Sequence, residues 1–267
     1  MKPLYTLLTA LLTITGISCK KVIQINLNSS NPQTVITAEV TDGPGPYQLS
    51  IYQSVNFSDP NSFPPVSGAK VVLRDNQSLV DTLVETSPGI YLTHSFWQGK
   101  SGNQYTIQVL SLGKTYEAVS TMPQRVPLDS VGFYDDNVRG SQTIIEPIPY
   151  FQDPPGVPNY YQFLETINDT ALNKLYIYDD QFSDGRYIHQ PLFDDSSHSH
   201  LQVNDRLLLT MYCIDAAAFN YLNTLQQVTS DGNFQSVTPA NPITNWSGGA
   251  LGYFSAHTVE SKSVIVK

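Results

Sequence analysis

The feature that most constrains the fold of this chain is a close succession of short strand-like runs, each bounded by turn-forming residues. In the run from Tyr47 to Gln53, Tyr47, Leu49 and Ile51 share one face, and Gln48, Ser50 and Tyr52 share the other. Asp-Gly-Pro-Gly-Pro precedes it at residues 42–46. Alternation of period two between turn signals predicts strands rather than helices. The runs cover residues 35–40, 47–53, 71–73, 79–84, 89–93, 104–110 and 115–120.

The last two runs predict a hairpin with a defined register. A short turn at residues 112–114, Leu-Gly-Lys, separates them. The residues expected to pair are Tyr105, Ile107 and Val109 with Tyr116, Ala118 and Ser120. Seven short strands in fewer than a hundred residues predict an immunoglobulin-like β-sandwich over residues 34–124.

The second half of the chain is less regular. Prolines at 123 and 127 punctuate a crossing segment, so we expect a second, β-rich domain over residues 125–267. Its predicted strands cover residues 131–134, 160–167, 175–178, 206–214 and 263–266. Two long polar segments, 135–159 and 179–205, are expected to be loops. Loops of this length in a compact domain are usually functional or disordered.

One helix is predicted near residues 215–229. Asp215 is a suitable N-cap, and apolar residues recur at helical spacing after it. The apolar stripe comprises Ala218, Phe219, Leu222, Leu225 and Val228. We expect this stripe to pack on the sheet of the second domain. The chain is therefore expected to be mainly β, with an N-terminal sandwich followed by a mixed β domain that carries one packed helix.

The N-terminus is typical of a lipoprotein signal. Lys2 is followed by an apolar and threonine-rich run from residue 4 to residue 17, and small residues lead into Cys19. The run is shorter than the ~20 residues that a spanning helix needs. We expect residues 1–18 to be a cleaved signal peptide, Cys19 to carry acyl chains, and residues 19–33 to be a tether. Gly16 departs from the large aliphatic residue common at that position, which leaves plain secretion as the alternative.

Charge and cysteine content narrow the function classes. Removal of residues 1–18, which include Lys2, leaves 249 residues and changes the net charge from −9 to −10. Phosphate backbones repel so acidic a chain, and no basic stripe is present, so nucleic-acid binding is excluded. With Cys19 acylated, Cys213 is alone and no intramolecular disulfide can form. Its apolar surroundings predict a core residue.

Two segments contain side chains that can ligate metals. Asp195, His198 and His200 form the stronger candidate, because His198 and His200 share one face of an extended segment. Two histidines and one carboxylate fall short of a fixed tetrahedral set, so a solvated loop is the competing interpretation. Asp180 and Asp184 resemble calcium ligands, but their spacing fits no helix–loop–helix calcium pattern. Asp184 with the following glycine is better explained as a turn. No cofactor is expected.

Aromatic residues support the main binding hypothesis. Tyr160, Tyr187 and Trp246 lie in or beside the long loops of the second half. Exposed Tyr and Trp rings bind sugars, peptides and protein partners, whereas alternate aromatic residues on a strand can equally be core. No Gly-x-Ser-x-Gly, His-Glu-x-x-His or phosphate-binding glycine motif occurs, so we assign no catalytic residue and expect a non-enzymatic protein.

The order of short motifs along the chain resembles a family of Bacteroidota lipoproteins, the domain of unknown function 4249. The motifs include Cys19 with its two lysines, Thr41-Asp42-Gly43-Pro44, Ser67-Gly68-Ala69, Pro88-Gly89-Ile90-Tyr91, Gly113-Lys114-Thr115-Tyr116, Thr121-Met122-Pro123, Phe182-Ser183-Asp184-Gly185 and Gly249-Ala250-Leu251-Gly252-Tyr253-Phe254. The resemblance implies a lipoprotein of the outer membrane, often encoded near TonB-dependent transporters. It implies no activity, because the family has none assigned, and therefore no site residues.

Together these observations predict a lipid-anchored accessory or binding protein of the outer membrane. Its expected partners are membrane lipid through Cys19, a TonB-dependent transporter, and a small-molecule, glycan or peptide ligand. The face of the membrane stays open, because Lys20 and Lys21 stand where some lipoproteins carry an acidic export tag. The alternatives are a structural, adhesion or assembly module and, less favoured, an envelope enzyme. An aromatic-lined pocket distinguishes the first function, an unpaired strand edge the second, and converging buried titratable groups the third.

Overall fold

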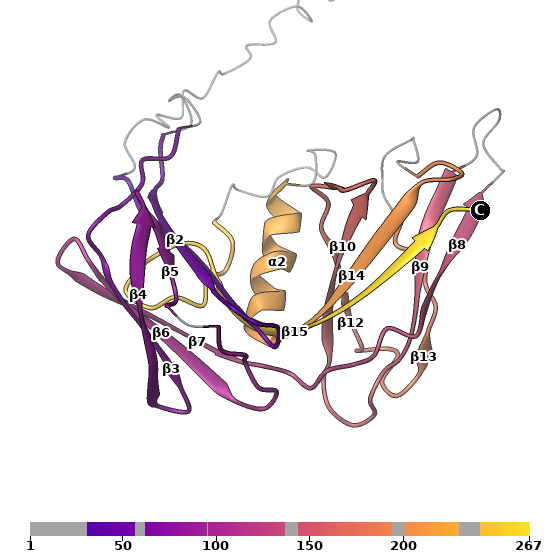
Figure 1. Cartoon of the computed structure of the whole chain (residues 1–267), viewed down its shortest axis with the longest axis horizontal. Helices are drawn as coiled ribbons and strands as arrows, with labels where there is room; N and C mark the ends of the chain where they lie inside the picture. Colours follow the sequence, from indigo (N-terminus) through magenta and orange to yellow (C-terminus); the bar gives the residue numbers. More distant parts are fainter. Residues whose placement is uncertain (1–30, 57–61, 95, 137–143, 194–200, 230–240) are drawn as a thin grey trace, which may run out of the picture.

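The computed structural model describes residues 31–56, 62–94, 96–136, 144–193, 201–229 and 241–267. The chain is mainly β, as predicted, with one large mixed sheet, one small sheet and a single long helix in the described parts. The strands form two lobes that one C-terminal strand joins (Figure 1). Each lobe has its own hydrophobic core, and the helix lies between them.

The first lobe contains all seven strands predicted for it. They are β1 (Thr34–Thr41), β2 (Gln48–Gln53), β3 (Lys70–Asp75), β4 (Ser78–Ser87), β5 (Ile90–Leu92), β6 (Gln104–Ser111) and β7 (Lys114–Thr121). The order β1-β2-β5-β4 followed by β3-β6-β7 matches the A-B-E-D and C-F-G sheets of immunoglobulin-like sandwiches. Because β4 pairs with both β5 and β3, the two sheets are continuous.

The predicted hairpin has the predicted register. Tyr105, Ile107 and Val109 pair with Ser120, Ala118 and Tyr116, and Leu112 and Gly113 form the turn at positive φ. Both φ values fit a two-residue type I′ turn. The Tyr105 hydroxyl accepts a hydrogen bond of 2.7 Å from the backbone N–H of Lys100, five residues upstream. A tyrosine that returns to the backbone in this way is a hallmark of immunoglobulin-like domains.

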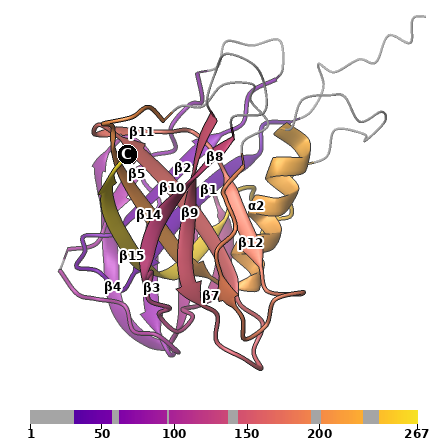
Figure 2. The same cartoon turned by 90° about the vertical axis from the view of Figure 1, so that its right-hand side faces the viewer.

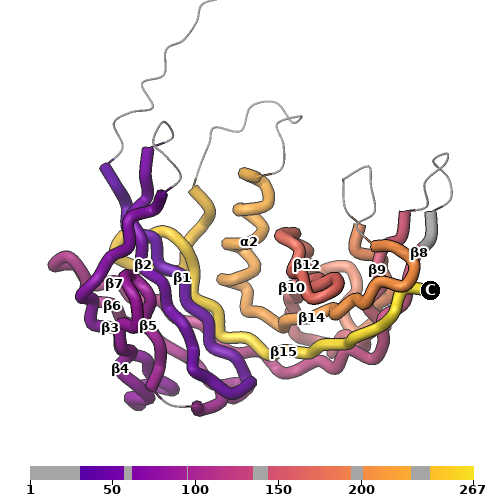
Figure 3. Tube along the Cα trace, turned by 45° about the horizontal axis from the view of Figure 1, so that its top comes forward, coloured from indigo at the N-terminus to yellow at the C-terminus, as the bar shows by residue number. Residues whose placement is uncertain are grey.

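Strand β15 (Phe254–Ile265) joins the lobes. Its first residues pair in parallel with β1, and its later residues pair antiparallel with β14 (Arg206–Ile214), as the tube in Figure 3 shows. The sequence predicts a closing strand only from residue 263. Residues 254–258 are buried on both faces, so they lack the alternation that marks a strand. Gly252 permits the close approach to β1, because a Cβ there would lie 2.1 Å from the Ile36 carbonyl oxygen.

The first core also contains residues from the C-terminal part of the chain. Trp246, Ala250, Phe254 and Ala256 are buried with Ile36, Leu49, Tyr91 and Tyr105. The sandwich predicted over residues 34–124 does not include these C-terminal residues. The N-terminal strands and residues 246–256 therefore form one packing unit, which ties the folding of the first lobe to the end of the chain.

The second lobe has two layers. One contains β10 (Tyr160–Ile167), β11 (Thr170–Ala171), β12 (Tyr176–Asp179), β14 and the end of β15. The other contains β8 (Ser130–Asp136), β9 (Ile144–Gln152) and β13 (Tyr187–Ile188). In Figure 2, β8 and β9 lie in front of β10 and β14. Phe151, Tyr161, Phe163, Leu209 and Met211 form the centre of the core between the layers. Cys213 is 3% exposed in this core, as predicted.

Strand β9 corrects the prediction of a loop over residues 135–159. Pro147 and Pro149 made the segment resemble a loop, because proline donates no hydrogen bond. In the structure β9 pairs along its length with β8, and on its other side the ladder with β13 includes only Gln152 and Phe151. Proline is tolerated where a strand lacks a continuous ladder on one side.

Helix α2 (Ala216–Thr229) follows β14 and packs on the sheet, as predicted, through Ala218, Phe219 and Leu222. The packed face is shorter than predicted, because Val228 is 45% exposed. The Asp215 carboxylate caps it, since Oδ1 accepts from the Ala218 N–H at 2.9 Å. Oδ2 of the same carboxylate accepts from the Ser120 hydroxyl at 2.7 Å and from the Thr121 N–H at 3.1 Å. Asp215 thus links the helix of the second lobe to strand β7 of the first.

Candidate functional site

A groove runs along one side of the second lobe, between β12 and residues 186–193. Two adjoining cavities of about 390 and 550 Å³ form it, and both are lined by Ile177, Tyr178, Ile188 and Gln190. Every residue from 174 to 179 lines one wall, and every residue from 186 to 193 lines the opposite wall. Phe219, Asn223 and Gln226 of α2 close one side. The groove follows the strands rather than crossing them.

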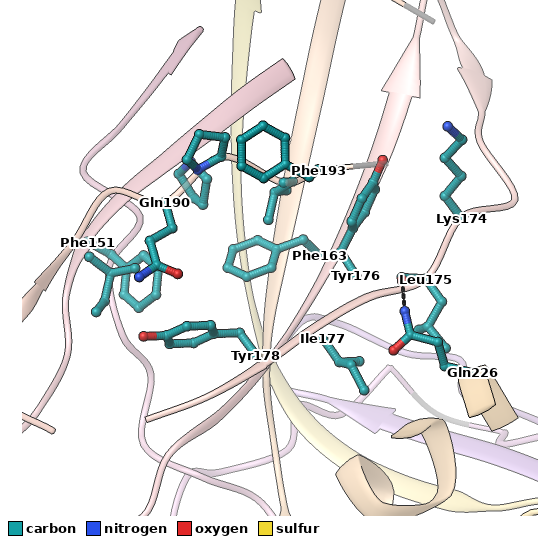
Figure 4. A pocket seen from close by; sticks show the side chains of 14 residues that line it. Phe151, Phe163, Lys174, Leu175, Tyr176, Ile177, Tyr178, Gln190, Phe193 and Gln226 are labelled. Atoms are coloured by element: carbon teal, nitrogen blue, oxygen red, sulfur yellow. Dashed lines mark hydrogen bonds between the residues drawn. The ribbon is translucent and has the colours of Figure 1, made fainter. Parts of the chain in front are cut away.

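Aromatic rings line the groove at two depths. Phe151 and Phe163 are fully buried, and the rings of Phe163, Tyr176, Tyr178 and Phe193 lie around the same space (Figure 4). Three large side chains stand exposed around the groove: Phe182 is 84% exposed, Phe193 63% and Tyr187 46%. Clustered exposed aromatic side chains beside a cavity mark an interaction site.

The two walls of the groove are strand edges. Among the described strands, β12 pairs only with β10, and β13 pairs only with β9. The groove therefore occupies a seam where, among the described residues, no backbone ladder joins β12 to β13. Gln226 of α2 partly covers the edge, because its side-chain amide donates to the Leu175 carbonyl at 3.1 Å (Figure 4).

The charges beside the groove are few. Arg186 and Asp179 both line the larger cavity. The Arg186 side chain is exposed, and it forms no ion pair with any residue that the structure describes. In a chain with 14 basic and 23 acidic residues, an unpaired guanidinium in an aromatic groove is available for an anionic group.

A set of buried titratable groups lies beneath the smaller cavity. Glu165 is 4% exposed, and burial together with the nearby Glu146 raises its pKa to about 7. Burial also raises the pKa of Glu146, which lies on the facing strand β9, and lowers the pKa of Lys174. Within the part of the chain that the structure describes, Oε1 of Glu165 has no hydrogen-bond partner. Lys174 and Tyr176 line the cavity, whereas neither carboxylate does.

Three aspartates form a second acidic cluster at the end of the groove. One oxygen each of Asp153, Asp180 and Asp184 lies within 4.8 Å of the others. Their oxygens already accept hydrogen bonds: Asp153 from the Tyr161 hydroxyl and the Gly185 N–H, Asp180 from the Asn159 N–H, and Asp184 from the Gly156 N–H. The cluster brings Asp180 and Asp184 together with a carboxylate that sequence spacing did not reveal. These hydrogen bonds give the cluster a structural role, because they hold residues 153–159 against residues 180–185.

The residues predicted for ligand binding have different environments. Tyr187 lies in the groove. Tyr160 packs on Phe219 of α2 at a ring distance of 4.9 Å, and Trp246 is 5% exposed in the first core, away from the groove. Cys19 and the metal candidates Asp195, His198 and His200 lie outside the described residues.

Sequence reasoning missed much of the groove. Phe182 and Phe193 lie within the polar loop predicted over residues 179–205, and neither is among the residues predicted for ligand binding. The available signal was the recurrence of aromatic residues within the loop over 179–205, where Phe182, Tyr187 and Phe193 are spaced five and six residues apart. Aromatic residues in an otherwise polar loop have no core to enter unless the loop folds back on the domain.

Comparison with known families identifies the chain. A family profile described as Domain of unknown function (DUF4249) matches residues 20–263, so the chain belongs to this family, as its sequence motifs predict. A comparison with curated proteins found no match. Among the described residues, no helix is long and apolar enough to cross a lipid bilayer.

Proposed function

We propose that this DUF4249 protein is a lipid-anchored, non-enzymatic binding protein of the outer membrane that captures a ligand in the groove and works beside a TonB-dependent transporter. The observation that carries the proposal is the groove itself. It is concave, lies in the second lobe, and combines buried with exposed aromatic side chains. Pockets with an apolar lining and a few polar groups are the usual binding sites of proteins.

The lipid anchor would allow a groove of weak affinity to bind its partner effectively at the membrane. Cys19 precedes the first described strand by 15 residues, enough for a tether that holds both lobes near the membrane. Tethering two partners to one surface raises their effective concentration, so weak contacts suffice for association. Replacement of Cys19 by Ala should move the protein from the detergent phase to the aqueous phase in detergent partitioning. Retention in the detergent phase contradicts the anchor.

The partner is tested by affinity purification of the full-length, tagged protein from native outer membranes. Recovery of a TonB-dependent transporter in stoichiometric amounts supports the proposal, and recovery of the protein alone, where other transporter complexes survive extraction, contradicts it. The double variant Phe182→Ser with Phe193→Ser should lose the partner. Leu79→Ser is the matched control, because Leu79 is an exposed apolar residue of the first lobe, 66% accessible.

An assembly role is the second candidate, and the open edges of β12 and β13 favour it. Such a role requires one copy of the chain to pair with another. Sedimentation velocity over a hundredfold range of protein concentration tests it. A monomer throughout supports the binding function over self-assembly, and a concentration-dependent series of oligomers supports assembly.

An enzymatic function has one specific observation in its favour, the buried pair Glu146 and Glu165. Perturbed carboxyl groups often mark active sites, although buried structural networks perturb pKa values as well. Both side chains are buried, and neither lines either cavity of the groove. A ligand in the groove would contact Lys174 and Tyr176 rather than the two carboxylates, so binding accounts for the geometry better.

A further inference from the structure

We propose that the groove accepts an extended peptide as an additional strand between β12 and β13, and that Arg186 pairs with a carboxylate of this peptide. The inference rests on the proposed function, because it names the ligand class for the same groove. It follows from the direction of the backbone groups on both walls, from the length of the groove and from its charge. Addition of a strand to an open sheet edge is a recurrent mode of peptide recognition.

The hydrogen bonds of β12 fix which of its backbone groups face the groove. The Asp180 N–H donates to the Asn159 carbonyl at 3.2 Å, in continuation of the ladder that pairs β12 with β10. Hydrogen-bonded pairs recur every second residue in an antiparallel ladder. Tyr178 therefore bonds to β10, while the N–H and C=O of Ile177 and Asp179 point away from it. No described residue bonds to the backbone of Ile177 or Asp179 at this edge.

The opposite wall has the same pattern. The Asp153 N–H donates to the Arg186 carbonyl at 3.0 Å, and the Leu192 N–H donates to the Pro147 carbonyl at 2.9 Å. Even-numbered residues of this wall therefore bond to β9, and the backbone of Tyr187 and His189 points away from it. The contact to these groups within the described residues is the His189 Nδ1, 3.3 Å from the Tyr187 carbonyl oxygen.

The groove has the length of a short strand. Six consecutive residues line one wall, from 174 to 179. At about 3.3 Å per residue this is roughly 20 Å, the length of an ordinary strand. Side chains of a bound strand would alternate between the buried rings of Phe151 and Phe163 and the exposed rings of Phe182 and Phe193. The fitting peptide is therefore extended, with apolar side chains at alternate positions.

The charge of Arg186 indicates which polar group the peptide carries. Arg186 is exposed and without an ionic partner among the described residues, whereas the chain as a whole is acidic. A guanidinium binds a carboxylate with two parallel hydrogen bonds, and aromatic neighbours strengthen the pair by excluding water. We therefore infer a peptide with either a terminal carboxylate or an acidic side chain near Arg186.

The experiment selects peptides from a random dodecapeptide library, displayed with free carboxyl termini, against the complete chain. Selected peptides are synthesised and their affinity is measured by fluorescence anisotropy. Tyr187→Pro removes one N–H that faces the groove, and Tyr187→Ala is its matched control because it removes the ring but keeps the N–H. Asp179→Pro and Asp179→Ala form the second pair. Proline is accepted at a strand edge where its missing N–H faces outward.

Strand addition predicts that each proline variant binds about tenfold more weakly than its alanine partner, the effect of one hydrogen bond that is lost on a desolvated edge. N-methylation of alternate amides in the peptide should abolish binding, whereas methylation of the intervening amides should not. Arg186→Gln should weaken binding and reduce its dependence on salt. Amidation of the peptide C-terminus reveals whether the carboxylate is terminal or on a side chain.

Equal affinities for the proline and alanine variants overturn strand addition, as does a library that yields no binder. N-methylation of the peptide tests the same bonds without altering the protein, so a proline variant that fails to fold does not decide the result. The two proposals fail separately. A transporter captured through Phe182 and Phe193 without any peptide binder leaves the proposed function in place and removes the strand-addition mode.

Discussion

The two lobes treat their strand edges in opposite ways. In the first lobe, β1 pairs with β15, and the outer edge of β7 is covered by Trp246 and Ser247. The Ser247 N–H donates to the Glu117 carbonyl at 2.8 Å, and the Glu117 N–H donates to the Ser247 hydroxyl at 3.0 Å. In the second lobe, β12 and β13 face each other across the groove, and among the described residues no strand pairs with the outer edge of either one.

This difference indicates that the second lobe, rather than the first, carries the surface for binding other molecules. Exposed strand edges attract other chains, and proteins usually cover them. The same chain uses residues 246–247 to cover an edge of the first lobe and leaves a seam beside three exposed aromatic residues in the second. The first lobe is therefore a closed scaffold, and the second carries the open surface. The predictions below test this contrast.

The largest effect is expected in the two cores. Tyr91→Ala in the first and Phe151→Ala in the second should each lower the free energy of unfolding by about 3–5 kcal/mol, because both rings are fully buried. Since β15 belongs to both lobes, each variant should shift a single cooperative transition in urea. Two transitions, with each variant shifting only its own, would show that the lobes are independent.

The second lobe should also contain the stronger pH dependence. The folded chain raises the pKa of Glu165 to about 7, first by burial and then through Glu146. The unfolded chain releases this proton near pH 4.3. The stabilisation is thus complete below that pH and is lost as the pH rises to about 7. Glu165→Gln should be more stable than the parent at pH 8 by on the order of 2–4 kcal/mol, and equal to it near pH 4.

Urea unfolding at several pH values between 4 and 8 measures this difference. The control is Glu117→Gln, an exposed carboxylate of the first lobe that should leave the pH profile unchanged. The opposite result would be a parent protein whose free energy of unfolding rises between pH 5 and 7, with Glu165→Gln removing that rise. It would show that Glu165 is stabilised as a charged ion-pair partner and that its pKa is lowered rather than raised.

The junction should show an intermediate effect. Asp215→Ala removes the helix cap and leaves the buried Ser120 hydroxyl without its acceptor. We expect a loss of about 2 kcal/mol, the sum of a cap and part of a buried hydrogen bond. Asp215→Asn, which keeps an oxygen for the cap, should lose less. Denaturation monitored by circular dichroism compares them, and equal losses for both variants would contradict the double role of Asp215.

The smallest effect on stability is expected at the groove. Phe182→Ser and Phe193→Ser remove exposed rings, so each should change the free energy of unfolding by less than about 0.5 kcal/mol. Their effect should appear in binding instead. A loss of stability as large as that of Phe151→Ala would mean that these rings complete the core, and the lobe would then have no open surface at this place.

Sequence patterns predicted the closed lobe better than the open one. Alternation between turn signals predicts all seven strands of the sandwich and the register of Tyr105 with Ser120. The pattern is clear because β1, β2, β3 and β7 alternate buried with more exposed residues. Strand β9 was missed because its prolines resemble a loop, and the start of β15 was missed because it is buried on both sides.

The groove could be predicted only in part, since it depends on contacts between distant segments. Tyr187 was identified from its position in a long loop, and the structure places it on the wall of the groove. The pairing of residues 186–192 with β9 is what brings Phe182 and Phe193 to the same groove as Tyr178. Nothing local to either segment encodes that pairing. Trp246 is the opposite case, because this predicted binding residue is buried. It lies in the first core, against strands that are 120 residues or more earlier in the chain.

Amide hydrogen exchange, followed by NMR on the native chain, measures directly which strand edges are closed in the first lobe and open in the second. The amides of Tyr178 and Ile188 should be protected, while those of Ile177, Asp179, Tyr187 and His189 exchange rapidly, an alternation that follows the two free edges. In the first lobe the Glu117 amide, covered by Ser247, should be protected although β7 is an outer strand. Protection of all the residues on the groove walls in the ligand-free protein would mean that the seam is already closed, and would contradict the account.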